Sequence, residues 1–185
     1  IEPKKFLITG NLPQRFPQKT YYRTIENPVD FAGHLFKFFL HNAGIKILGK
    51  TVTGSTPETT TALATWESPP LSVIVRALNK HSSNFVAEQI VKTMAIAAGQ
   101  SPGTTAQGIQ VVEEELHKLG IPAQSYQMLN GSGLHMKNRL TANQLAQVLT
   151  AAWQDFRIRP EFLTSLPIAG LDGTLVTRLQ DTAAL

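Results

Sequence analysis

The stretch NKHSSNFVAEQIVKTMAIAA, residues 79–98, constrains the fold most, because a polar start is followed at once by a long apolar pattern. Ser82, Ser83 and Asn84 stand where a helix is expected to begin. Apolar residues then recur on more than one face, at Val86, Ala87, Ile90, Val91, Met94, Ala95 and Ala98. A helix that is apolar nearly all round is normally buried. The pattern therefore predicts a central helix whose mouth carries small polar side chains.

Capping residues and apolar periodicity predict further helices. Asn27 and Pro28 form an N-cap followed by proline at the first helical position, and Gly44 ends that helix. Its core-facing stripe is expected to hold Val29, Ala32, Leu35, Phe36, Phe39 and Leu40. The remaining helices are expected over residues 71–78, between residue 104 and Gly120, after Thr141, and from Arg159.

Four short runs predict strands, at residues 4–9, 45–48, 60–66 and 125–129. No internal repeat and no low-complexity tract occurs, and helical patterns cover more of the sequence than strand patterns do. The expected fold class is therefore α+β, dominated by helices and with a few short strands.

Composition excludes several classes of function. The 185 residues contain no cysteine, which rules out disulfides, zinc-thiolate sites and thiol nucleophiles within them. The net charge of +4 is spread without a basic stripe, so nucleic-acid binding is not expected. No apolar run approaches the roughly 18 residues of a membrane span, so no transmembrane segment is expected. The first residue is isoleucine and no signal-peptide pattern follows, which indicates a processed chain or a fragment.

Ser82 and Asn84 have two interpretations. Serine and asparagine are preferred N-caps, since their oxygens satisfy amide groups of the first turn. Alternatively, both side chains point into a cleft, where the Ser82 hydroxyl relays a proton and the Asn84 carboxamide holds a substrate amide carbonyl. The Ser-x-Asn pattern by itself favours capping and leaves both interpretations open.

Other candidate sites are weaker. The loop NGSGL, residues 130–134, matches neither a phosphate-binding loop nor a nucleophile elbow. Glu113 and His117 lie one helical turn apart but lack a third metal ligand nearby. His34 and His41 are seven residues apart, a spacing typical of no metal site. No metal site is therefore predicted.

Four blocks of sequence resemble the low-molecular-mass class C penicillin-binding proteins, which are D-alanyl-D-alanine carboxypeptidases and endopeptidases. The Ser-x-Asn motif is followed by NFVAE at residues 84–88, as in that family. NGSGL precedes NRLTA at residues 138–142, and LPIAGLDGTL follows at residues 166–175. Earlier, residues 26–52 resemble the family's passage into its penicillin-binding core. The blocks stand in the family's order.

This resemblance implies a helix-dominated portion of a penicillin-binding, serine β-lactamase-like fold. Residues 1–25 would end an inserted β-rich domain, and residues 26–185 would be part of the penicillin-binding catalytic domain. Ser82 and Asn84 would be catalytic, as the family's second active-site motif, with no metal or organic cofactor. The implied partners are peptidoglycan peptide stems ending in D-Ala-D-Ala and β-lactam antibiotics. The implied location is the bacterial periplasm or cell envelope.

The sequence departs from the family in lacking its two other active-site motifs, S-x-x-K and K-T-G. No serine has a lysine three residues later, and Lys-Thr at Lys19, Lys50 and Lys92 is never followed by glycine. The interpretation is a fragment of a serine peptidase that is inactive by itself. One alternative is a non-catalytic relative or interaction module that keeps the fold, and another is an unrelated helical domain with chance motif matches.

Overall fold

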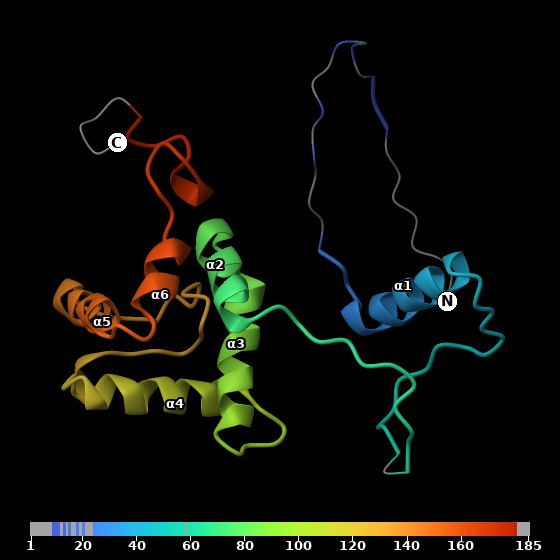
Figure 1. Cartoon of the computed structure of the whole chain (residues 1–185), viewed down its shortest axis with the longest axis horizontal. Coiled ribbons are helices and arrows are strands. Elements are labelled where there is room, and N and C mark those ends of the chain that lie inside the picture. Colours follow the sequence, from blue (N-terminus) through green and yellow to red (C-terminus); the bar gives the residue numbers. More distant parts are fainter. Residues whose placement is uncertain are drawn as a thin grey trace. The chain divides into compact units, whose positions relative to one another are not determined.

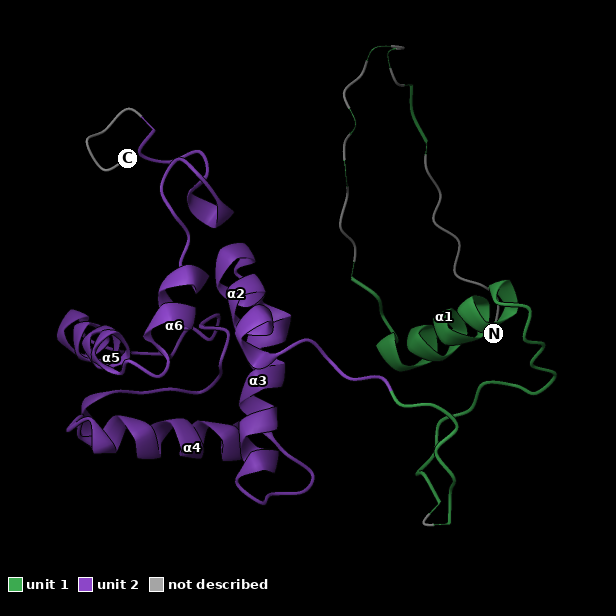
Figure 2. Ribbon diagram, viewed as in Figure 1, with its two compact units in different colours: residues 1–65 green, residues 66–185 purple. Residues whose placement is uncertain are grey.

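The computed structural model describes residues 9–11, 13, 15, 18, 20, 24–57 and 59–180. The chain divides into two compact units, Ile1–Thr65 and Trp66–Leu185, which Figure 2 colours green and purple. The predicted domain boundary between residues 25 and 26 falls inside the first unit and stays a prediction. The predicted strand at residues 4–9 lies outside the described residues except for Thr9.

The first unit carries helix α1 (Pro28–Asn42), and its ends are those predicted. The Asn27 side chain accepts a hydrogen bond from the Asp30 amide at 3.1 Å, and Pro28 occupies the first helical position. Beyond the last turn, Gly44 adopts φ +82° and its amide donates to the His41 carbonyl at 2.9 Å. Glycine at this point lets the chain leave the helix through the left-handed conformation.

The predicted core-facing stripe of α1 is wrong, because no residue of this helix is buried by the described part of the chain. Phe36 and Phe39 remain 64% and 59% exposed. The helix instead contacts the segment that follows it: Lys37 Nζ donates to the Gly49 carbonyl at 2.8 Å, and Gly33 faces the Thr51 side chain. Periodicity identifies an apolar face, but burial requires a second layer to cover it.

The predicted short strands are not confirmed among the described residues. The segments 45–48 and 60–66 form no strand, and residues 125–129 begin with the last residue of the 3₁₀ turn η1 (Ala123–Ser125). The nearest approach to a sheet is one antiparallel bridge, in which Gln127 and Arg139 exchange backbone hydrogen bonds of 2.9 and 2.8 Å. A strand needs a partner for its backbone groups along its length. The helix-dominated character of the fold is confirmed.

The described part of the second unit contains five α-helices and two 3₁₀ turns, η1 and a second one near its end. Figure 1 labels the helices. The helices are α2 (Leu71–His81), α3 (Asn84–Ala97), α4 (Thr105–Lys118), α5 (Ala142–Gln154) and α6 (Arg159–Ser165), and the second turn is η2 (Gly173–Leu175). Thr104 and Thr141 each make a capping box with the glutamine three residues later. All five helices lie where the sequence predicts them. Within the described residues, no helix has both the length and the apolarity to cross a bilayer.

The core of the second unit lies where α3 crosses α4, and α2 packs against α6 and η2. The buried apolar residues there are Val91, Ala95, Ile109, Leu116 and Ile121. Gly108 makes the crossing possible, since a Cβ at that position would lie 2.6 Å from the Val91 carbonyl carbon. The predicted burial of α3 is confirmed for Val91 and Ala95, whereas Ala98 of the predicted apolar set is exposed.

Replacing Gly108 by alanine should destabilise the protein by about 1–3 kcal/mol, the usual cost of overpacking. Helix propensity alone would predict a gain of up to about 1 kcal/mol, so the sign of the change tests the crossing. Urea unfolding measures it. Gly54→Ala is the matched control, because its Cβ would meet nothing within 4 Å and a change within about 0.5 kcal/mol is expected. A stabilised Gly108→Ala variant would contradict the close crossing.

Candidate active site

Ser82 and Asn84 lie at the junction between α2 and α3. Helix α2 ends at His81 and α3 begins at Asn84, so only Ser82 and Ser83 connect them. Ser82 and Asn84 are both exposed, whereas Ser83 between them is half-buried. The structure thus brings the two predicted catalytic side chains to one helix mouth and keeps both out of the apolar interior.

The capping role in this turn belongs to Ser83. Its hydroxyl accepts a hydrogen bond from the Val86 amide at 3.4 Å, as an N-cap does. Within the described residues, the side chains of Ser82 and Asn84 make no hydrogen bond. The capping interpretation therefore holds for the middle residue, and the side chains of its two neighbours are exposed. The catalytic interpretation of these neighbours stays a prediction.

Ser82 adopts the left-handed conformation, with φ +53° and ψ +50°. Its amide and that of Ser83 both donate to the Leu78 carbonyl, the second at 3.1 Å. This is the hydrogen-bond pattern of a helix C-terminus at which glycine is usual. For a residue with a Cβ the conformation costs roughly 1–2 kcal/mol. Such strain persists where the surroundings hold it in place, which is common at functional sites.

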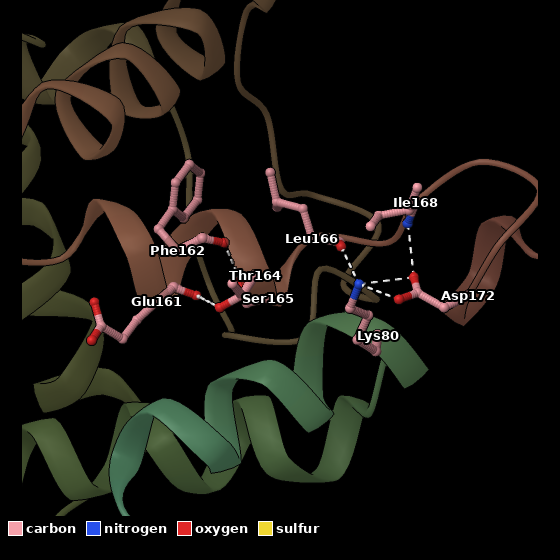
Figure 3. Close-up of polar contacts among 8 residues, drawn as sticks. All are labelled: Lys80, Glu161, Phe162, Thr164, Ser165, Leu166, Ile168 and Asp172. Atoms are coloured by element: carbon pink, nitrogen blue, oxygen red, sulfur yellow. Dashed lines mark hydrogen bonds and ion pairs between the residues drawn. The ribbon is translucent and has the colours of Figure 1, made fainter. Parts of the chain in front are cut away.

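Figure 3 shows how the last turn of α2 is held by the loop at residues 166–172. Lys80 Nζ donates to both carboxylate oxygens of Asp172, at 2.6 and 2.8 Å, and to the Leu166 carbonyl at 2.5 Å. One of those carboxylate oxygens also accepts from the Ile168 amide at 2.8 Å. The hydrogen bond from Lys80, followed by that from the Ile168 amide, lowers the pKa of Asp172 below its ordinary value. The carboxylate therefore stays ionised wherever the protein is folded near neutral pH.

Two further contacts reach the same turn of α2. Asn79 Nδ2 donates to the Ser165 hydroxyl at 2.8 Å, and this fully buried hydroxyl donates in turn to the Phe162 carbonyl at 2.6 Å. Gly173, at φ +59°, lies against the backbone of Lys80, where a Cβ would come within 2.7 Å of the carbonyl oxygen. The sequence of this loop resembles that of a known family, but it indicates no role for Lys80 or Asp172. Residues 92 positions apart carry no sequence signal of their contact.

The NGSGL loop packs against α3 and makes hydrogen bonds to it. Glu88, in the second turn of α3, accepts a hydrogen bond from the Ser132 amide at 3.0 Å. Burial acts to raise the pKa of Glu88, but hydrogen bonds from the Ser132 side chain and from the Ser132 and Gly131 amides lower it overall, with help from Lys92. Gly131 approaches α3 closely, since a Cβ there would lie 2.5 Å from Val91 Cγ2. The loop is thus tied to a carboxylate and to the helix core.

The side chains of two asparagines make hydrogen bonds within the NGSGL loop and its flanking residues. Asn130 Nδ2 donates to the Ser132 hydroxyl at 2.9 Å, and Asn138 Nδ2 donates to Asn130 Oδ1 at 2.7 Å. The Asn138 carboxamide oxygen accepts from the Leu129 amide at 2.8 Å. This network connects the NGSGL block with the NRLTA block.

The weaker candidates do not form sites in the described residues. No group of three or more histidine, aspartate or glutamate side chains there could hold a metal ion. Two hollows on the second unit are lined by residues of α5 and α6 and by Leu119 and Leu166, not by Ser82 or Asn84.

Replacing Ser82 by glycine should raise the free energy of unfolding by about 0.5–1 kcal/mol, because glycine carries no left-handed penalty and loses part of this gain through its flexible unfolded state. Ser82→Ala removes the same hydroxyl but keeps the Cβ, so it should give no gain. Urea unfolding of both variants measures the difference. A Ser82→Gly variant no more stable than Ser82→Ala would mean that the left-handed turn is not formed.

Comparisons with known proteins place these motifs in a family. The chain is 33% identical to a D-alanyl-D-alanine carboxypeptidase from an Actinomadura species, over 96% of this chain and 34% of that protein. It is 36% identical to carboxypeptidase DacB of Mycolicibacterium smegmatis, over 67% of this chain and 27% of that protein. The chain thus spans about a third of the length of the curated relatives that it matches.

Solved structures share the fold. Penicillin binding protein 4 of Haemophilus influenzae superposes with a TM-score of 0.73 and 26% identity, over 83% of this chain and 34% of that one. A complex of the same protein with a β-lactam gives a TM-score of 0.71 at 24% identity, over 84% and 36%. Chance motif matches in an unrelated helical domain are excluded, because the D-Ala-D-Ala carboxypeptidase 3 (S13) family matches residues 1–185 throughout. The chain has the Ser-x-Asn turn and the NGSGL loop, and the family matches it along all of its 185 residues. The chain therefore belongs to the D-Ala-D-Ala carboxypeptidase 3 (S13) family.

Proposed function

We propose that this chain is part of a serine-type D-alanyl-D-alanine carboxypeptidase/endopeptidase, which acts on peptidoglycan peptides through an acyl-serine intermediate and is inhibited covalently by penicillins. The observation that carries the proposal is the α2–α3 turn. Ser83 satisfies the helix cap, while Ser82 and Asn84 remain exposed on either side of it. The relatives' names, D-alanyl-D-alanine carboxypeptidase and penicillin binding protein, support the same substrate class and inhibitor.

In the proposed reaction, a serine whose hydroxyl proton is taken up by a neighbouring lysine attacks the carbonyl carbon of the penultimate D-Ala. The peptide C–N bond breaks, the terminal D-Ala leaves as an amine, and water then hydrolyses the acyl-enzyme. The Ser82 hydroxyl passes a proton from the lysine beside the nucleophile to the leaving amine. The Asn84 carboxamide hydrogen-bonds a substrate amide and keeps the carbonyl in reach of the nucleophile.

The nucleophile and its lysine are proposed to lie outside these 185 residues, since no S-x-x-K occurs within them, and neither does K-T-G. Residues 1–25 would end an inserted domain, and residues 26–185 would form the helical side of the catalytic domain. No metal or organic cofactor has a part in this mechanism. The proposed peptidoglycan substrate also supports our proposal of a location in the bacterial periplasm or cell envelope.

The alternative function is a non-catalytic relative or interaction module that keeps the fold. The observation that favours it is the same absence of two active-site motifs from the sequence. The complete coding sequence discriminates between the two functions. S-x-x-K upstream together with K-T-G downstream supports the enzyme, and the lack of either supports the module.

In the complete protein, Asn84→Ala should slow acylation by a labelled penicillin by roughly 100-fold, the effect of losing a positioning contact. Its free energy of unfolding should change by no more than about 0.5 kcal/mol, because the side chain is exposed. The measurement is the single-turnover rate of labelling. Asn143→Ala is the matched control, an exposed asparagine in the first turn of α5, and should react as the wild type does. Equal rates for wild type and Asn84→Ala would refute the assigned role.

Residues 1–185 by themselves should form no covalent adduct with penicillin, because acyl transfer needs an activated nucleophile. The segment is incubated with a fluorescent penicillin and run on a denaturing gel beside the complete protein. Labelling of the complete protein alone is the expected result. A labelled band from the segment would mean that the nucleophile lies within it.

A further inference from the structure

The strained turn at Ser82 requires a restraint from outside α2. The backbone hydrogen bonds to the Leu78 carbonyl are those of any helix end with this geometry, and they do not by themselves favour serine in a left-handed conformation. A non-glycine residue stays in such a conformation when neighbouring contacts over-determine it. The contacts of the residues just before Ser82 are therefore the ones to consider.

Those contacts converge on Asn79 and Lys80 from residues 165–173. Lys80 is the central one: its ammonium group has three N–H donors, and three acceptors lie within 2.8 Å of Nζ. Only 14% of the Lys80 side chain is exposed, against 38% of the Asp172 side chain. A lysine so covered and so fully hydrogen-bonded has no donor left for a substrate, so it does not replace the catalytic lysine missing from this sequence.

We infer that Lys80 and Asp172 form a positioning pair, which holds the last turn of α2 so that Ser82 keeps the left-handed geometry in which its hydroxyl serves acyl transfer. The inference rests on the proposed function and adds to it two residues that touch neither substrate nor nucleophile. Asp172 fixes Lys80 from one side (Figure 3). Gly173 permits the loop to lie directly against the Lys80 carbonyl. Lys80 is two residues before Ser82, so a shift of this turn moves the hydroxyl.

A competing explanation is that the pair only fastens the loop to α2. The two explanations differ in how Asp172 couples to Ser82. If the Lys80–Asp172 pair acts through the Ser82 hydroxyl, breaking the pair lowers the acylation rate only when that hydroxyl is present. If it merely stabilises the fold, its loss has the same effect in either background. A double-mutant cycle separates these cases.

The test measures the acylation rate constant and the dissociation constant of the non-covalent complex with a labelled penicillin, in the complete protein. Asp172→Asn should lower the acylation rate constant at least tenfold and change the dissociation constant less than threefold. In the Ser82→Ala background, the same substitution should lower the rate less than threefold further. Asp155→Asn is the matched control, since it breaks the Arg157 ion pair in the α5–α6 connection, and should leave both constants unchanged.

If Asp172→Asn does not fold, Asp172→Glu takes its place in the cycle, because it keeps the charge and moves the carboxylate by one methylene. A smaller loss of rate is then expected, again only while Ser82 is present. Equal losses with and without the Ser82 hydroxyl, or a wild-type rate for the Asp172 variants, would overturn the inference and leave the proposed function standing.

Amide hydrogen exchange distinguishes failure of the inference from failure of the proposed function. Asp172→Asn should accelerate exchange of the Ser82 and Ser83 amides at least tenfold relative to those of α5. Unchanged exchange would overturn the inference whatever the enzyme does. A wild-type protein that penicillin does not acylate, or a Ser82→Ala variant that reacts at the wild-type rate, would instead refute the proposed function and the catalytic part of the inference with it.

Discussion

Close backbone packing at Val91 is the contact on which the second unit depends. Gly108 of α4 and Gly131 of the NGSGL loop both lie against this residue, and neither position has room for a Cβ. Because glycine brings backbone against side chain and backbone, α3 can be covered from two directions within a small core. The few buried apolar residues lie mainly at this crossing. Helix α3 is therefore held firmly in the core, and the α2–α3 turn lies at its N-terminal end.

Two of the sequence blocks shared with this family contact the helices on either side of the α2–α3 turn. One block braces α3 through Glu88, in the turn that follows Asn84. Another holds the end of α2 through Lys80, two residues before Ser82. A site placed on helix ends and held by neighbouring loops is more precisely positioned than one on a free loop. The small number of residues that would touch substrate thus depends on a larger number that never do.

The sequence predicts the helices well because residues close together in the sequence determine where each helix begins and ends. Asn27, Thr104 and Thr141 cap helices through hydrogen bonds that span three residues, and such patterns can be read without the fold. The placement of Ser82 and Asn84 at a helix mouth follows from the same kind of pattern. The left-handed turn at Ser82 has no such cue, since glycine does not mark it.

Features that depend on distant partners were not predictable. The ion pair between Lys80 and Asp172 joins residues from separate motifs, and neither residue type is unusual in its place. The apolar stripe of α1 was predicted to face a core, but periodicity says only that a face is apolar and not what lies on it. The strand runs at residues 45–48 and 60–66 failed for a related reason. Apolar or β-branched composition favours a strand, whereas pairing forms one.

The cap provided by Ser83 has a consequence for how this turn can evolve. The three consecutive residues have different roles. The middle one stabilises helix α3, and its two neighbours take part in the proposed chemistry. Ser, Thr, Asp and Asn all serve as N-caps at similar cost. The middle position can therefore vary among these residue types, within the limits of its half-buried surroundings. Under the proposed function, Ser82 and Asn84 are expected to stay constant. In related sequences, a variable residue at the position of Ser83 between constant residues at the positions of Ser82 and Asn84 would reflect these different roles.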